Sequence, residues 1–151
     1  MPNDFHLYIV YRHINSTFVE EARLETDDSS LHSFGVSVSV SGNLVALGDR
    51  AYGDANEGAV FIYEYNALAD AWNQNGIVIN DDCDGLFGSS LAFTDDQGLI
   101  IGCSNELNRT GAVYYYVQSE TYAGIKFVLK KQKISASEGD LFDDFGHAEQ
   151  I

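Results

Sequence analysis

The fold is decided by the stretch SFGVSVSVSGNLVALGDRAYGDANEGAVFIYEY, which runs from Ser33 to Tyr65. A looser copy, LFGSSLAFTDDQGLIIGCSNELNRTGAVYYYVQ, runs from Leu86 to Gln118. Phe-Gly pairs recur at spacings of 53 and 58 residues, at Phe34-Gly35, Phe87-Gly88 and Phe145-Gly146. Gly-Ala-Val recurs 53 residues apart, and another step of 53 back from Gly58 reaches Phe5, where FHLYIVYR is a fair match. Self-similarity at such a period is typical of stacked supersecondary units, with repeat arrays or propeller blades the leading options.

Each copy reads as four antiparallel strands. Apolar residues alternate with small ones or form aromatic and β-branched runs, Gly and Asn turns separate these runs, and no sustained helical periodicity is present. The expected strands are 34–40, 44–47, 59–65 and 72–79 in the first unit, and 87–93, 99–103, 112–117 and 125–134 in the second. Four-stranded units of about 50 residues predict an all-β fold built from β-propeller blades.

The order of these motifs resembles the FG-GAP repeat. Each copy has Phe-Gly-x-Ser, then a strand that ends in an apolar residue and Gly, then Gly-Ala-Val and an aromatic residue. The GAP element departs from the pattern, reading Gly48-Asp49-Arg50 and Gly102-Cys103-Ser104. The family builds the β-propeller of integrin alpha subunits and of other, mostly extracellular, propellers. The resemblance therefore implies a propeller, a role in protein interaction or cell adhesion, and an extracellular or surface location.

The repeated Phe and Gly residues are interpreted as scaffold. Phe34 and Phe87 are expected to fill the space between blades, while Gly35 and Gly88 allow the backbones to approach closely. Small residues on the first strand, such as Ser37, suit a narrow central channel.

The chain is predicted to contain one domain made of whole and partial blades. These are the back half of a blade over 5–27, complete blades over 31–80 and 84–134, and the start of a further blade over 141–151. Propellers close a ring of about six to eight blades, because closure removes unpaired sheet edges. The chain is therefore expected to belong to a larger propeller, to complete a ring with other copies, or to form a short open array that docks on a partner.

Composition excludes several classes of function. The 151 residues are enough for one real core, and the formal charge of −15 argues against nucleic acid and anionic membranes as partners. A basic protein partner or metal cations fit this charge better. No apolar run approaches membrane-spanning length, and the first residues lack the pattern of a signal peptide.

Acidic residues collect in the loops that are expected at one end of the blades. They define a candidate ligand or interaction face, although ordinary acidity of surface loops is the alternative interpretation. The face comprises Asp49, Asp54, Glu57, Asp82, Asp84, Glu106, Asp140 and Asp143.

One acidic loop resembles the first half of a calcium loop. Asn80, Asp82 and Asp84 place oxygen side chains at alternate positions before Gly85, and calcium requires several such oxygens around one point. Leu91 stands where the acidic twelfth ligand is expected. The family's own calcium loop lies between the first and second strands, where this chain is too short for it. Calcium at Asn80, Asp82 and Asp84 is therefore a candidate without support from the resemblance.

Cys83 and Cys103 are too few to predict a disulfide framework. A bond between them is sterically allowed if their Cα atoms lie within about 7 Å. Two small thiols, buried or half-buried, in a reducing compartment are the simpler interpretation.

Two sequons lie in predicted hairpin loops, at Asn15-Ser16-Thr17 and Asn108-Arg109-Thr110. They mark Asn15 and Asn108 as glycosylation candidates, which favours an exported protein.

The sequence contains no recognisable catalytic motif. The four histidines lack metal-ligand spacing, and neither a Gly-x-Ser-x-Gly elbow nor a phosphate-binding loop is present. We therefore expect a non-catalytic structural or protein-interaction module that requires no cofactor, with further blades or another protein as its partner. The alternative is a carbohydrate- or calcium-binding propeller of lectin type.

Overall fold

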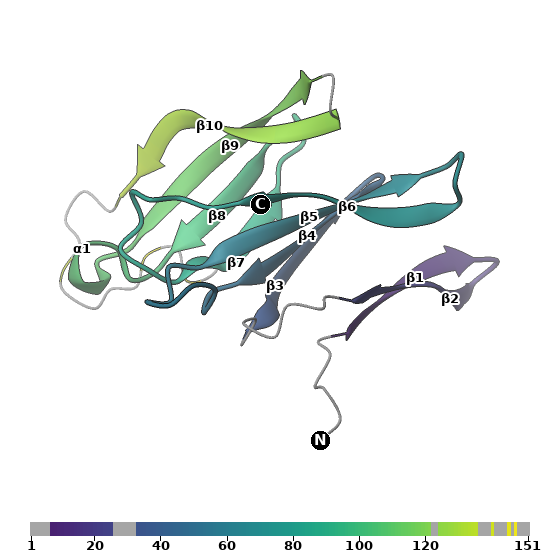
Figure 1. Cartoon of the computed structure of the whole chain (residues 1–151), viewed down its shortest axis with the longest axis horizontal. Helices are drawn as coiled ribbons and strands as arrows, with labels where there is room; N and C mark the ends of the chain where they lie inside the picture. The colour runs from purple at the N-terminus through teal and green to yellow at the C-terminus, as the bar shows by residue number, and fades with distance from the viewer. Residues whose placement is uncertain are drawn as a thin grey trace.

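The computed structural model describes residues 7–25, 33–121, 124–135, 140, 145 and 147. Its described part is all-β apart from one helical turn, and comprises antiparallel sheets of two, four and four strands (Figure 1). The predicted all-β class is confirmed. Asp143, the ends of the predicted 5–27 unit and most of the predicted 141–151 unit lie outside the described residues.

The N-terminal hairpin consists of β1 (Leu7–Ile14) and β2 (Thr17–Glu25). Asn15 and Ser16 form its two-residue turn with positive φ angles of 48° and 65°. Asn at the first such position is typical of the primed turns that match strand twist in hairpins.

The first sheet has the strand order β3-β4-β5-β6, and each expected strand of this unit is confirmed within about two residues. Its central strands are buried on both faces, whereas β3 alternates between a covered and an exposed face. The strands are β3 (Phe34–Ser41), β4 (Leu44–Asp49), β5 (Ala59–Asn66) and β6 (Ala71–Val78).

The second sheet repeats this order as β7-β8-β9-β10, and its four expected strands are also confirmed. One helical turn, α1 (Glu106–Arg109), lies in the loop between its second and third strands. The strands are β7 (Phe87–Phe93), β8 (Leu99–Cys103), β9 (Ala112–Thr121) and β10 (Gly124–Ile134).

The two four-stranded sheets pack against each other around one hydrophobic core (Figure 1). Leu44, Ala46 and Ile62 of the first sheet meet Phe87 and Leu91 of the second. All five side chains are buried, and burial of apolar surface at about 25 cal/mol per Å² holds the sheets together.

Backbones of the two sheets approach closely at glycines. A Cβ atom on Gly58 would lie 2.1 Å from the Phe87 carbonyl oxygen, and one on Gly88 would lie 2.7 Å from that of Ala59. Both glycines have positive φ, at 86° and 82°, which other residues rarely adopt. The expected close approach at Gly88 is confirmed, and Phe87 is fully buried beside it.

Serines of β3 face the second sheet. The Ser37 hydroxyl donates to the Gly88 carbonyl oxygen at 2.7 Å, and the Phe93 amide donates to the Ser39 hydroxyl at 3.0 Å. The Ser37 hydroxyl therefore links the two sheets.

The contact that joins the sheets is repeated once more along the chain. Gly58 forms a parallel bridge with Phe87, and Gly111 forms one with Phe145. The Phe145 amide donates to the Thr110 carbonyl oxygen at 3.2 Å. Phe145 therefore meets the second sheet as Phe87 meets the first.

The N-terminal hairpin packs on the opposite face of the first sheet. Tyr8 and Val10 contact a second core that includes Leu24 and Phe34, and the Tyr8 hydroxyl donates to the Phe34 carbonyl oxygen at 2.6 Å. Ile9, between them in sequence, is 38% exposed. One face of β1 is thus half-buried and the other is exposed.

The register of β1 differs from the expected alignment by one residue. Tyr8 and Val10 face the first sheet as Val60 and Ile62 face the second, which is a step of 52 rather than 53 residues. Because side chains alternate along a strand, a slip of one residue exchanges its two faces. The alignment through Phe5 is therefore wrong by one position.

Candidate functional site

The acidic loops of both sheets meet at one end. The Leu86 amide donates to the Asn56 carbonyl oxygen at 2.8 Å, and the Asn105 side chain donates to the Asp84 carbonyl oxygen at 3.3 Å. Of the predicted face, Asp54, Glu57, Asp82 and Asp84 carry exposed carboxylates at this end, and Asp140 is also exposed. These five side chains are exposed to solvent.

Asp49 does not belong to this exposed face, because it is completely buried at the end of β4. Its Oδ1 accepts hydrogen bonds from the Ser33 and Ala51 amides at 3.1 and 3.0 Å, while its Oδ2 has no partner among the described residues. The carboxylate therefore holds the entrance of β3 against the end of β4. Together with desolvation, the Asp49 charge raises the pKa of Tyr8, with desolvation the larger effect.

Glu106 is likewise buried and joins several elements. Its carboxylate pairs with Lys133 of β10, accepts from the Tyr114 hydroxyl at 3.2 Å, and accepts from the Asp84 amide at 3.3 Å. Burial raises the pKa of Tyr114, and the Glu106 charge raises it further. The predicted place of Glu106 on an exposed face is wrong. Nothing in the local sequence distinguishes Glu106 from the exposed acids, because its charge partner, Lys133, lies 27 residues away in the chain.

Cys83 and Cys103 form a disulfide with Cα atoms 6.1 Å apart. The interpretation of two free thiols is therefore wrong, because the turn before β7 brings Cys83 onto the end of β8 at Cys103. The bond lies beside Glu106, whose Oε2 is 3.5 Å from the Cys103 sulfur. Among the described residues, these three are the one group with metal-ligand atoms all within 4.8 Å of one another. Thiolates are the metal ligands, so the bond withholds two of the three.

The candidate calcium loop is partly used by the fold. Asn80 is buried, and its side-chain oxygen accepts from the Asp82 amide at 2.9 Å. The Tyr114 hydroxyl also donates to the Asp82 carbonyl oxygen at 3.1 Å. Asp82 and Asp84 keep exposed carboxylates, and the described residues bring no third acid into a ligand group with them.

The two sequons lie in different settings. Asn15 is exposed in the turn of the N-terminal hairpin, as expected. Asn108 lies in α1, the helical turn within the loop that joins β8 and β9, so it too lies in the expected hairpin loop.

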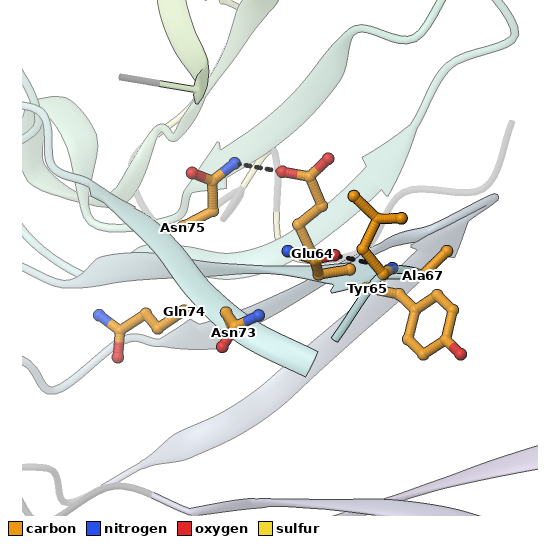
Figure 2. A pocket seen from close by; sticks show the side chains of 8 residues that line it. Glu64, Tyr65, Ala67, Asn73, Gln74 and Asn75 are labelled. Carbon is orange, nitrogen blue, oxygen red and sulfur yellow. Dashed lines mark hydrogen bonds between the residues drawn. The ribbon is translucent and has the colours of Figure 1, made fainter. Parts of the chain in front are cut away.

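Two cavities border the β5–β6 hairpin. One of about 390 Å³ is lined mostly by polar residues of the β5–β6 hairpin, where Glu64 and Asn75 point toward each other (Figure 2). The Asn75 amide donates to Glu64 at 2.9 Å. This cavity has no convergent pair of acid and base groups.

A second cavity of about 370 Å³ lies between the N-terminal hairpin and the first sheet. Its aromatic wall is Tyr65 and Trp72, and the Arg12 guanidinium lies 5.4 Å from the Tyr65 ring centre. Arg12 pairs with Glu21, and Tyr65 donates to Asp70 at 2.5 Å. Aromatic and charged groups of this kind are suited to a polar ligand, although here they already bind one another.

Three valines on β3 lie on the exposed side of that strand. Val36, Val38 and Val40 are 44%, 56% and 63% exposed. We call this surface the valine face. Sequence reasoning missed it, although the alternation Val-Ser-Val-Ser-Val shows that one face of this strand is apolar.

No protein-family model and no curated protein matches this chain. Among the described residues, no helix is long and apolar enough to cross a membrane.

Proposed function

We propose that the chain is a non-catalytic structural and protein-interaction module built from β-propeller blades. The supporting observation is the twice-used contact between a Gly before one strand and the Phe that begins the next sheet, at Gly58–Phe87 and Gly111–Phe145. A contact that repeats in this way stacks sheets side by side, and stacked four-stranded sheets are the plan of a propeller. The FG-GAP resemblance supports the same assignment and an extracellular or surface location.

The interaction surfaces of this module are the exposed acidic loops and the valine face. The carboxylates of Asp54, Glu57, Asp82 and Asp84 suit a basic partner, and the chain's charge of −15 favours rapid encounter with one. The alternative, a carbohydrate- or calcium-binding module of lectin type, is favoured by the Tyr65–Trp72 cavity and by exposed Asp82 and Asp84.

Light scattering and thermal melting in calcium or in chelator separate these two functions. A structural module is expected to keep one mass and one melting temperature in both solutions, and to give no saturable response on a glycan array. If calcium raises the melting temperature of the parent chain and this rise is lost in Asp82→Asn, the calcium-binding alternative is supported instead. Asp54→Asn, on an exposed residue outside the calcium loop, is the matched control.

A further inference from the structure

The valine face has a covered counterpart in the second sheet. Aligning Phe34 with Phe87 places Val38 at Leu91 and Val40 at Phe93. Leu91 is only 7% exposed, against 56% for Val38, because the first sheet lies over it. The same strand position is thus closed in one sheet and open in the other.

Two strands of the first sheet close this position. Leu44 and Ala46 of β4 share a core with Leu91, and Ser37 and Ser39 of β3 bond to the β7 backbone. The β3–β4 hairpin is therefore the cover of β7. An equivalent hairpin over β3 would cover the valine face.

The N-terminal hairpin offers this missing cover a place to attach. Its strand β1 pairs only with β2 among the described residues, whereas its counterpart β5 pairs with both β4 and β6. Because Tyr8 takes the place of Val60, the second edge of β1 corresponds to the edge of β5 that receives β4. The open edge and the valine face therefore border the same space, next to an interface already formed by β1 and β2.

We propose that this space binds a two-stranded β-hairpin of a partner polypeptide, which adds to the edge of β1 and covers Val36, Val38 and Val40. This inference rests on the proposed function and names the partner's chemistry. By analogy with β3–β4, the partner's first strand carries small hydroxyl side chains toward β3, and its second strand carries apolar side chains of the size of Leu44 and Ala46. Main-chain bonds to β1 supply affinity and the facing side chains supply specificity.

A fusion that supplies such a hairpin tests the site. A copy of residues 33–57 is placed directly before His6. In the parent chain this segment is followed by Gly58, two residues before Val60, and His6 likewise lies two residues before Tyr8. Fusion is preferred to a free peptide because an isolated hairpin is marginally stable, and a tether raises its effective concentration. We expect the melting temperature to rise by roughly 4 °C or more. We also expect amide exchange to slow along the edge of β1 that faces away from β2.

Val38→Asp is the matched control. In the unfused chain it changes an exposed side chain and is expected to leave the melting temperature nearly unchanged. In the fused chain it places a charge under the hairpin and is expected to abolish both the rise and the protection. The proposal is overturned if the fused chain has the melting temperature of the parent chain and amide exchange along β1 does not slow.

A second copy of the chain is the competing occupant. If the unfused chain forms a dimer that Val38→Asp dissociates, and the fusion gives no protection, a copy covers the valine face and the hairpin proposal fails. These outcomes are independent of calcium and sugars. A chain that responds to those ligands contradicts the proposed function, whereas a missing response to the fused hairpin contradicts only the inferred partner.

Discussion

At the scale of single residues, Asp49 and Glu106 are predicted to lie on a ligand face, but both carboxylates are buried and stabilise the fold. Asp49 receives two backbone amides, and Glu106 receives Lys133, Tyr114 and a backbone amide. A buried carboxylate is stable only with such partners, because the loss of its hydration must be offset by hydrogen bonds and opposite charge.

Asp49→Ala is expected to lower the free energy of unfolding by about 1–3 kcal/mol, because it leaves the Ser33 and Ala51 amides without their acceptor. Asp49→Asn keeps an acceptor oxygen and should lose less. Urea unfolding measures both, with exposed Asp54→Ala as the control. Equal losses for Asp49→Ala and Asp54→Ala would show that the bonds to Asp49 contribute nothing.

Alkaline pH is expected to destabilise the fold through two tyrosines. Burial raises the pKa of Tyr114 and Tyr116 above the ordinary value of 10.0. The folded chain therefore retains these protons where the unfolded chain releases them, so stability is fully present below about pH 10 and falls as pH rises beyond it. Tyrosine absorbance and the urea midpoint, followed together, measure this. Tyr116→Phe should weaken the pH dependence, while exposed Tyr11→Phe should not.

At the scale of elements, the strands could be predicted but their neighbours could not. Period-2 alternation and Gly-Asn turns are local signals, and they placed all eight strands of the two four-stranded sheets. Which face of β3 is covered depends on the packing of whole sheets, so the sequence alone does not show that Ser37 bonds to the next sheet or that Val38 is exposed. For the same reason the register of β1 and the burial of Glu106 were missed, since the partners of both lie far away in sequence.

The disulfide is expected to stabilise the second sheet by about 3 kcal/mol, the entropy that closing a loop of this length removes from the unfolded chain. A Cys83→Ala, Cys103→Ala double variant, compared with the parent by urea unfolding, measures the contribution. Adding reductant should lower the midpoint of the parent and leave that of the double variant unchanged. An unchanged parent would mean that the bond contributes no stability.

At the scale of the whole molecule, the chain is a stack in which each sheet is covered by the sheet before it. The first sheet covers β7, and the N-terminal hairpin covers one face of the first sheet but leaves the valine face exposed. Stacked units of this kind are stabilised mainly by nearest-neighbour interfaces. The stack is consequently well buried at its centre and open at the valine face.

Because Leu91 is covered and its counterpart Val38 is exposed, truncating the two side chains should lower the free energy of unfolding by different amounts. Leu91→Ala should lower the free energy of unfolding by about 2–5 kcal/mol, because it empties a buried site between the sheets. Val38→Ala should cost less than about 1 kcal/mol, because Val38 is 56% exposed. Urea unfolding of the two variants decides the point, and equal losses would show that Val38 is already covered in solution.

In each four-stranded sheet, the segment that leads into the first strand is bonded to the end of the second strand, but the type of bond differs between the two sheets. Asp49 lies opposite Phe34 in the first sheet, and Cys103 lies opposite Phe87 in the second. Asp49 holds Ser33 through a hydrogen bond, and Cys103 holds Cys83 through a covalent bond. A reducing compartment would therefore break the Cys83–Cys103 bond of the second sheet and leave the Ser33–Asp49 hydrogen bond of the first sheet intact. Two units of nearly the same design thus differ in their sensitivity to the cell's reducing power.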